Sequence, residues 1–133
     1  MIWHGRNIFA GNVEGEALVT RMGISFFGGV DPDTGIIVER GHELEGQCIS
    51  GKVLVFPTGK GSTVGSYTLY RLRHSGKGPA AIINTECETI TAVGCIIAEI
   101  PCVDKIPIEQ FHTGITIVVR NDGDNASVEI KED

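Results

Sequence analysis

The stretch that decides the fold runs from Val53 to Arg73 and reads VLVF (53–56), PTGKGSTVGS (57–66) and YTLYRLR (67–73). An apolar run, a glycine-rich turn and an amphipathic segment in this order predict a strand, a loop and the start of a helix. Glycines let the backbone approach a ligand closely, and the first N–H groups of a helix have no intrahelical partner. We therefore expect an anion-binding site here, to which Lys60, Ser62 and Thr63 add a cation and two hydroxyls.

Three known glycine-containing motifs do not fit this turn. A P-loop needs Gly-Lys followed by Ser or Thr, whereas Lys60 is followed by Gly61. A dinucleotide-binding fingerprint needs Gly-x-Gly-x-x-Gly, and the spacing of Gly59, Gly61 and Gly65 is one residue too long. A nucleophile elbow needs Gly-x-Ser-x-Gly, and Ser62 follows Gly61 directly. Nucleotide binding and α/β-hydrolase chemistry are therefore disfavoured.

Length and charge limit the class of protein. A chain of 133 residues predicts a single domain over residues 1–133, large enough to bury one good core. With 17 acidic and 11 basic residues the net charge is −6, which disfavours nucleic acid and anionic membranes as partners. No apolar stretch approaches the roughly 18 residues that span a bilayer, and the first residues lack a signal-peptide h-region. We expect a cytoplasmic protein.

The cysteines and histidines do not form a recognisable metal motif. The four cysteines show no Cys-x-x-Cys spacing and lie in or beside apolar runs, so buried free thiols are favoured over metal ligands. The four histidines do not pair at helical or hairpin metal spacing. We expect no metal bound by this chain alone.

Most of the chain outside this stretch is predicted as strand and turn. Runs rich in β-branched residues and bounded by Gly, Pro, Asn or Asp predict strands at 16–20, 52–56, 80–84, 95–100, 115–120 and 127–131. One main helix is expected over 63–74, closed by Gly76, with short helical turns around 86–93 and 108–111. A helix between strands 53–56 and 80–84 indicates a parallel pair. The fold class expected is α+β, with a barrel-like sheet covered by few helices.

A second glycine-rich stretch, FGGVDPDTG (27–35), is either a tight loop or part of an active-site floor. Together with GKVL (51–54) and PTGKGSTVGS (57–66), its motifs closely resemble, in spacing and order, the small subunits of the aconitase X group. The resemblance covers most of the chain. It implies a three-layer β/β/α swivelling domain that docks on a larger subunit carrying a 4Fe–4S cluster.

The resemblance also implies a reaction, which is the dehydration of (R)-5-phosphomevalonate to trans-anhydromevalonate 5-phosphate in the archaeal mevalonate route to isoprenoids. In aconitase-type enzymes a loop serine of the swivelling domain is the base, and the matching residue here is Ser62. A serine alkoxide needs stabilisation, which the backbone of Gly59, Gly61 and Thr63 and the ammonium of Lys60 would supply. Taken without the resemblance, Ser62 is more often a helix N-cap. Ser66 is expected to hydrogen-bond within the first helical turn.

The pattern departs from aconitases at the position that follows the loop serine. Many aconitases place there an arginine that binds a substrate carboxylate, but Ser62 is followed by Thr63 and Val64. Lys60 or the larger subunit must then hold the anion. His42 and Arg40, in the stretch ERGHE (39–43), are secondary candidates for contacting the substrate, and a solvated loop is the alternative for both.

Two other functions stay open at this point. Bacterial relatives dehydrate cis-3-hydroxy-L-proline, and the separate small chain favours phosphomevalonate only modestly over that substrate. A non-catalytic anion-binding module is the alternative from another class, because swivelling domains also carry phosphohistidine. That role needs a histidine at the glycine-rich tip, and His42 and His74 lie outside the 59–66 loop.

Overall fold

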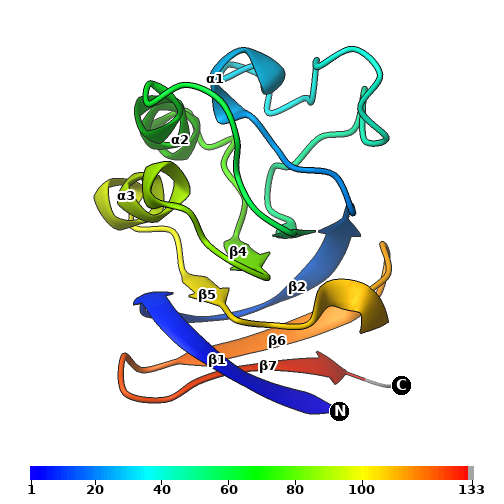
Figure 1. Cartoon of the computed structure of the whole chain (residues 1–133), viewed down its shortest axis with the longest axis vertical. Coiled ribbons are helices and arrows are strands. Elements are labelled where there is room, and N and C mark those ends of the chain that lie inside the picture. The colour runs from blue at the N-terminus through cyan, green and yellow to red at the C-terminus, as the bar shows by residue number, and fades with distance from the viewer. Residues whose placement is uncertain (132–133) are drawn as a thin grey trace.

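In a computed structural model, which describes residues 1–131, seven strands close into a barrel in the order β1-β5-β4-β3-β2-β6-β7 (Figure 1). The strands are β1 Ile2–Phe9, β2 Gly11–Val19, β3 Val53–Phe56, β4 Ala81–Asn84, β5 Cys102–Asp104, β6 Thr116–Asn121 and β7 Ala126–Lys131. The helices are α1 Phe26–Gly29, α2 Gly65–His74, α3 Thr89–Ala98 and the 3-10 turn η1 Ile108–Gln110.

The parallel pair predicted around the glycine-rich stretch is confirmed. β3 pairs in parallel with β4, with Val53 opposite Ala81 and Phe56 opposite Asn84, and α2 makes the crossover between them. β2 and β5 extend this parallel arrangement on either side. Every residue of β3, β4 and β5 is buried, as expected for strands that are covered on both faces.

Two separate cores give the molecule its three layers. Along β3 the side chains alternate, so that Leu54 and Phe56 pack toward the helices while Val53 and Val55 fill the barrel interior. The interior core also contains Ile117 and its neighbours from the antiparallel β6–β7 hairpin. Figure 1 shows α2 and α3 on one side of β4 and β5, with β6 and β7 at the opposite end. The predicted α+β class and β/β/α layering are confirmed.

The two N-terminal strands were not predicted in full. β1 pairs with both β5 and β7, and β2 begins at Gly11 rather than at residue 16. Both strands carry polar or exposed side chains at alternate positions, so neither forms the apolar run by which the inner strands were found. The turn at 121–125 does join β6 to β7.

The strand predicted over 95–100 is wrong, because residues 95–98 form the second half of α3. The Glu88 side chain caps this helix by accepting hydrogen bonds from the backbone N–H groups of Ile90 (2.8 Å) and Thr91 (2.7 Å). Gly94 then lets α3 pack against Leu69 of α2 without a side chain between them. Capping and helix packing outweigh the β propensity of this segment, and the helical turn expected at 86–93 is part of a ten-residue helix.

None of the helices within residues 1–131 is long and apolar enough to cross a membrane.

Candidate active site

The glycine-rich loop lies where the parallel strands end. It leaves the carboxyl end of β3 and enters α2. Loops at the carboxyl ends of parallel strands commonly bind ligands. A second segment holds it in place, because Ile24 forms a parallel bridge with Gly59 and accepts a hydrogen bond from the N–H of Lys60 (2.9 Å). Backbone hydrogen bonds to Ile24 thus hold the start of the loop at the carboxyl end of β3.

Two of the glycines cannot be replaced without moving their neighbours. A Cβ at Gly59 would overlap the carboxylate of Glu88 and the hydroxyl of Thr91. Gly61 has a φ of +97°, which side chains disfavour, and a Cβ there would overlap the Oγ of Ser25. Close packing therefore shapes the backbone on either side of Lys60.

Ser62 is exposed at the tip of this loop. Its carbonyl oxygen accepts from the N–H of Gly65 (2.9 Å), and its Oγ accepts from the N–H of Val64 at 3.2 Å. Val64, not Ser62, occupies the N-cap position of α2. Within residues 1–131 the N–H groups of Gly61, Ser62 and Thr63 have no hydrogen-bond acceptor, and successive free N–H groups of this kind suit an anion.

The cation of the loop is neutralised in this structure. The Nζ of Lys60 lies 2.9 Å from Oε2 of Glu39, and both side chains are partly exposed. Arg40 follows Glu39, is exposed, and forms no ion pair within the described part of the chain. The structure thus brings Glu39 beside Lys60 of the glycine-rich loop, and Arg40 is the next residue along the chain.

His42 does not lie in a solvated loop. Its side chain is buried, and its Nε2 lies 3.0 Å from the carbonyl oxygen of Gly23 while its Nδ1 accepts from the N–H of Leu44 (3.1 Å). Both ring nitrogens are therefore engaged in holding the 39–45 loop. The next carboxyl, that of Glu43, has a pKa below its ordinary value, because the Thr20 hydroxyl and the Arg21 amide donate hydrogen bonds to it.

The hydroxyl of Ser66 bonds to the neighbouring helix and not within its own first turn, contrary to the prediction. Its Oγ donates to the carbonyl oxygen of Ile90 in α3, at 2.5 Å. The first turns of α2 and α3 lie close enough for this bond because Gly94 faces the Cα of Ser66. Ser66 thus fastens two helices together, and the prediction failed because nothing in the local sequence places Ile90 nearby.

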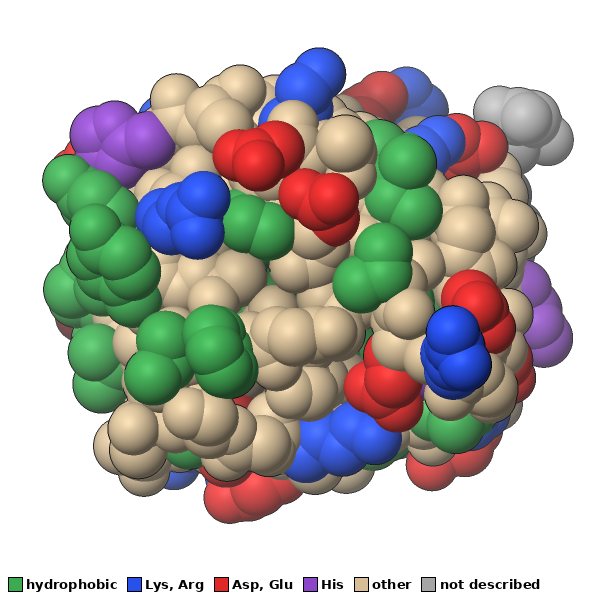
Figure 2. All heavy atoms as spheres, turned by 90° about the horizontal axis from the view of Figure 1, so that it is seen from above, with side chains coloured by type: hydrophobic (Ala, Val, Ile, Leu, Met, Phe, Trp, Pro, Cys, Tyr) green, Lys and Arg blue, Asp and Glu red, His purple; other side chains and the backbone are tan. Residues whose placement is uncertain are grey.

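The start of the second glycine-rich stretch lies beside the first. A Cβ built on Gly65 would lie 3.8 Å from the backbone nitrogen of Phe27, and one on Gly29 would lie 3.3 Å from Oε1 of Glu39, the partner of Lys60. Gly28 has a φ of +83° that interrupts α1, so this element is a single irregular turn. Figure 2 looks onto the end of the molecule that carries α1 and α2, where acidic, basic and hydrophobic side chains are intermixed. The first residues of this stretch therefore lie beside the start of α2, whereas Pro32 and Gly35 lie at its other end, against Ser75 and Lys77.

Three of the four cysteines are buried. Cys87 and Cys102 bring their sulfur atoms within 4.0 Å of each other, and the pKa of the Cys87 thiol is raised by that neighbour and by burial. The pKa of Cys102 is raised as well, with Cys95 and burial as the causes. Among residues 1–131 no cluster of three His, Cys, Asp or Glu side chains could hold a metal ion.

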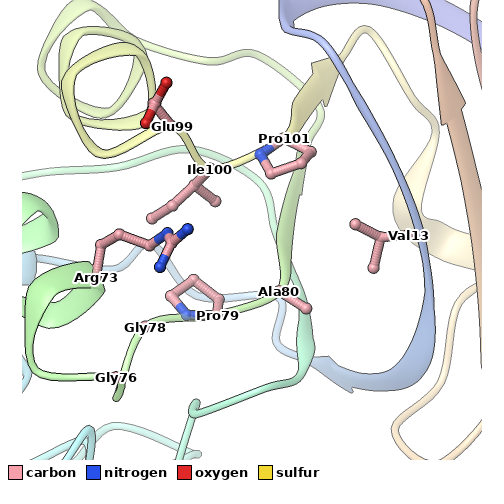
Figure 3. Close-up of a pocket in the computed structure, with 9 residues that line it drawn as sticks. All are labelled: Val13, Arg73, Gly76, Gly78, Pro79, Ala80, Glu99, Ile100 and Pro101. Atoms are coloured by element: carbon pink, nitrogen blue, oxygen red, sulfur yellow. The ribbon is translucent and has the colours of Figure 1, made fainter.

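A cavity of about 300 Å³ lies away from Ser62 (Figure 3). It is lined by residues at the start of β4, before β5 and at the end of α2, which is the opposite end of the parallel strands. Figure 3 shows the Arg73 guanidinium turned toward Ile100 and Pro79, and the Glu99 carboxylate turned away. We assign it no part in the site.

Sequence reasoning missed three residues that shape the loop. Ser25 packs against Gly61, Glu39 pairs with Lys60, and the cap residue Glu88 lies against Gly59. A helix start at Glu88 could have been recognised from the turn that precedes it. The contacts of Ser25 and Glu39 carry no local signal, because they join segments more than 20 residues apart.

Comparison with known proteins is consistent with this geometry. The family model described as the aconitase X swivel domain matches residues 2–130. The chain is 52% identical to the phosphomevalonate dehydratase small subunit of Thermococcus kodakarensis, over 97% of this chain and 96% of that protein. It is 58% identical to the small subunit of the same name from Methanosarcina mazei, over 86% of this chain and 82% of that protein.

A solved structure agrees with the same assignment. The crystal structure of Thermococcus kodakaraensis aconitase X in its holo-form superposes with a TM-score of 0.95 at 49% identity, covering 99% of each chain. The match therefore extends over both sheets, both long helices and the glycine-rich loop. The chain belongs to the aconitase X swivel domain family.

Proposed function

We propose that the chain is the small subunit of a hydro-lyase that dehydrates (R)-5-phosphomevalonate to trans-anhydromevalonate 5-phosphate in the archaeal mevalonate pathway. The observation that carries this proposal is the similarity, over nearly the whole chain, to proteins named phosphomevalonate dehydratase small subunit. The exposed anion-binding loop around Ser62 supports it, because the substrate is a phosphorylated hydroxy acid. Dehydration of cis-3-hydroxy-L-proline is the less favoured alternative.

The active site is proposed to be shared with a larger subunit. The described residues of this chain offer no ligand set for a metal, so the 4Fe–4S cluster that aconitase-type chemistry uses would be held by that partner. When bound, such a cluster supplies a Lewis acid for the departing hydroxyl group. This chain would supply the base and part of the anion site.

Ser62 is the proposed base for the proton α to the substrate carboxylate. A serine alkoxide is unstable at neutral pH unless positive charge or N–H groups surround it. The free N–H groups of 61–63, the start of α2 and the ammonium of Lys60 are the groups nearest in sequence to Ser62 that can do so. The exposure of Ser62 leaves its Oγ accessible to a substrate held between the subunits.

Lys60 and Arg40 are proposed to bind the anionic groups of the substrate. Lys60 is paired with Glu39, so it would exchange a carboxylate of the protein for one of the substrate. Exposed pairs of this kind contribute little, about 0–1 kcal/mol, so the exchange is easy. Gly59, Gly61 and Thr63 would add backbone N–H groups. His42, whose ring nitrogens are both engaged, would only position the 39–45 loop.

Reconstitution tests the proposal directly. The chain and the larger subunit from the same organism are mixed anaerobically, and (R)-5-phosphomevalonate and cis-3-hydroxy-L-proline are offered in parallel. We expect turnover of the phosphorylated substrate only. Turnover of the proline derivative alone would replace the substrate assignment, and no turnover of either would contradict the hydro-lyase assignment.

The isolated chain is expected to bind no cluster iron and to have no dehydratase activity. The pKa values of the buried Cys87 and Cys102 thiols are raised, which disfavours the thiolates that bind a cluster, and no cluster of three possible metal ligands lies among the described residues. Iron and sulfide analysis after anaerobic reconstitution of this chain alone provides the measurement. Stoichiometric cluster iron would overturn the division of roles between the subunits.

Both glycine-rich stretches are expected to become protected when the larger subunit binds. A site shared between chains must be closed from water during turnover, and the second stretch begins beside Gly65, at the end of the 59–65 loop. Hydrogen exchange of the chain with and without the larger subunit measures this. Unchanged exchange in both stretches would contradict a shared site.

A further inference from the structure

Helix α3 has an exposed outer face that is largely apolar. Residues 89–98 include no charged side chain. Thr91, Gly94, Cys95 and Ala98 form the buried inner face of the helix. On the outer face, the exposed fractions of Val93, Ile96 and Ile97 are 43%, 50% and 45%. A helix that is hydrophobic all round is normally buried, and clustered exposed apolar side chains mark an interaction site. Figure 2 shows hydrophobic side chains gathered on the side where α2 and α3 lie in Figure 1.

This outer face of α3 is continuous with the candidate active site. Residues 90, 93 and 97 fall on one stripe of the helix, with spacings of three and four. The stripe begins where the loop that carries Ser62 enters α2, because Ile90 Cγ2 lies 3.3 Å from a Cβ built on Gly65, the first residue of α2. Val64, at the end of that loop, is itself 43% exposed. The apolar surface therefore leads from the loop along α3.

We propose that the outer face of α3, formed by Val93, Ile96 and Ile97, docks on the larger subunit of the dehydratase. This inference rests on the proposed function, in which that subunit closes the site at Ser62. A surface that closes the loop lies next to the first turn of α3, since Ile90 packs beside Gly65 and accepts a hydrogen bond from Ser66 where the loop enters α2. A second copy of this chain on the same face would occupy the place beside the loop that the larger subunit needs.

A matched pair of substitutions tests the docking surface. Ile97→Lys places a charge on the outer face of α3, and Ile2→Lys places the same charge on an equally exposed isoleucine at the start of β1, beside β7. Binding of each variant to the purified larger subunit is measured by titration. We expect Ile97→Lys to raise the Kd at least ~30-fold, as for an interface hot spot, and Ile2→Lys to leave it within ~2-fold.

The outcomes separate docking from the proposed function. A wild-type Kd for Ile97→Lys would overturn the inference, whether or not the complex is active. So would a dimer of the wild-type chain alone that Ile97→Lys dissociates while its Kd for the larger subunit stays unchanged. If Ile97→Lys raises the Kd but the wild-type complex does not turn over (R)-5-phosphomevalonate, the result supports docking and contradicts the proposed function. If Ile97→Lys lowers the Tm, Ile97→Ala replaces it, with a Kd at least ~10-fold higher expected.

Discussion

Replacing Ser62 by alanine is expected to lower the kcat of the assembled dehydratase at least ~100-fold, the low end of what a positioned general base contributes. The change removes only the Oγ of an exposed side chain whose one local hydrogen bond, from the N–H of Val64, is long at 3.2 Å. Folding and subunit association should therefore stay normal. Steady-state turnover of (R)-5-phosphomevalonate by the variant complex is the measurement, with cis-3-hydroxy-L-proline as the rival substrate.

Ser66→Ala is the matched control for this prediction. It removes a hydroxyl of the same motif that donates to Ile90 in α3, so we expect a loss of about 1 kcal/mol in unfolding free energy and nearly normal turnover. The two serines should thus give opposite results in the two assays. If the Ser62→Ala complex turns over either substrate at the wild-type rate, the base belongs to the larger subunit.

Phe56→Ala is expected to destabilise the chain by about 3–5 kcal/mol, the usual cost of deleting a buried phenyl ring. Phe56 is fully buried between β3 and the helices, with its ring edge-on to Phe26 at a centroid distance of 5.9 Å. The cavity would open directly below the glycine-rich loop. A fall in Tm of roughly 10 °C or more is expected in thermal unfolding followed by circular dichroism.

Phe27→Ala controls for the loss of an aromatic ring as such. Phe27 is the neighbour of Phe26 in α1, but its side chain is 52% exposed. Exposed positions of this kind usually change stability by about 0.5 kcal/mol or less. Equal Tm values for Phe56→Ala and the wild type would show that Phe56 does not fill the core between the sheet and α2.

Prediction from the sequence succeeded where the determining contacts are local. The apolar run at 53–56, the glycines after it and the periodicity of 67–73 lie within 21 residues, and each element follows from its own composition. The candidate loop was found for the same reason. What the loop contacts could not be found in this way, because Glu39 and Glu88 are brought to it by other elements.

The predictions that were wrong concern segments whose structure depends on contacts with residues far away in the sequence. Segment 95–100 has the composition of a strand, yet its first four residues are helical because Glu88 caps α3 and Gly94 fits against α2. The hydrogen bond of Ser66 and the burial of His42 likewise depend on Ile90 and Gly23, which are 24 and 19 residues away. Propensity describes a segment alone, and packing decides it when the two disagree.

By itself the sequence determined the strand, loop and helix of 53–74, the α+β class and the serine at the loop tip, since hydrophobic period and glycine positions are properties of the chain as written. Only the tertiary structure decided that Lys60 is paired with Glu39, that both nitrogens of His42 are engaged, and that α3 leaves an apolar face beside the loop. These features arise where the closed barrel and its helices bring distant segments together, and no local pattern encodes such contacts.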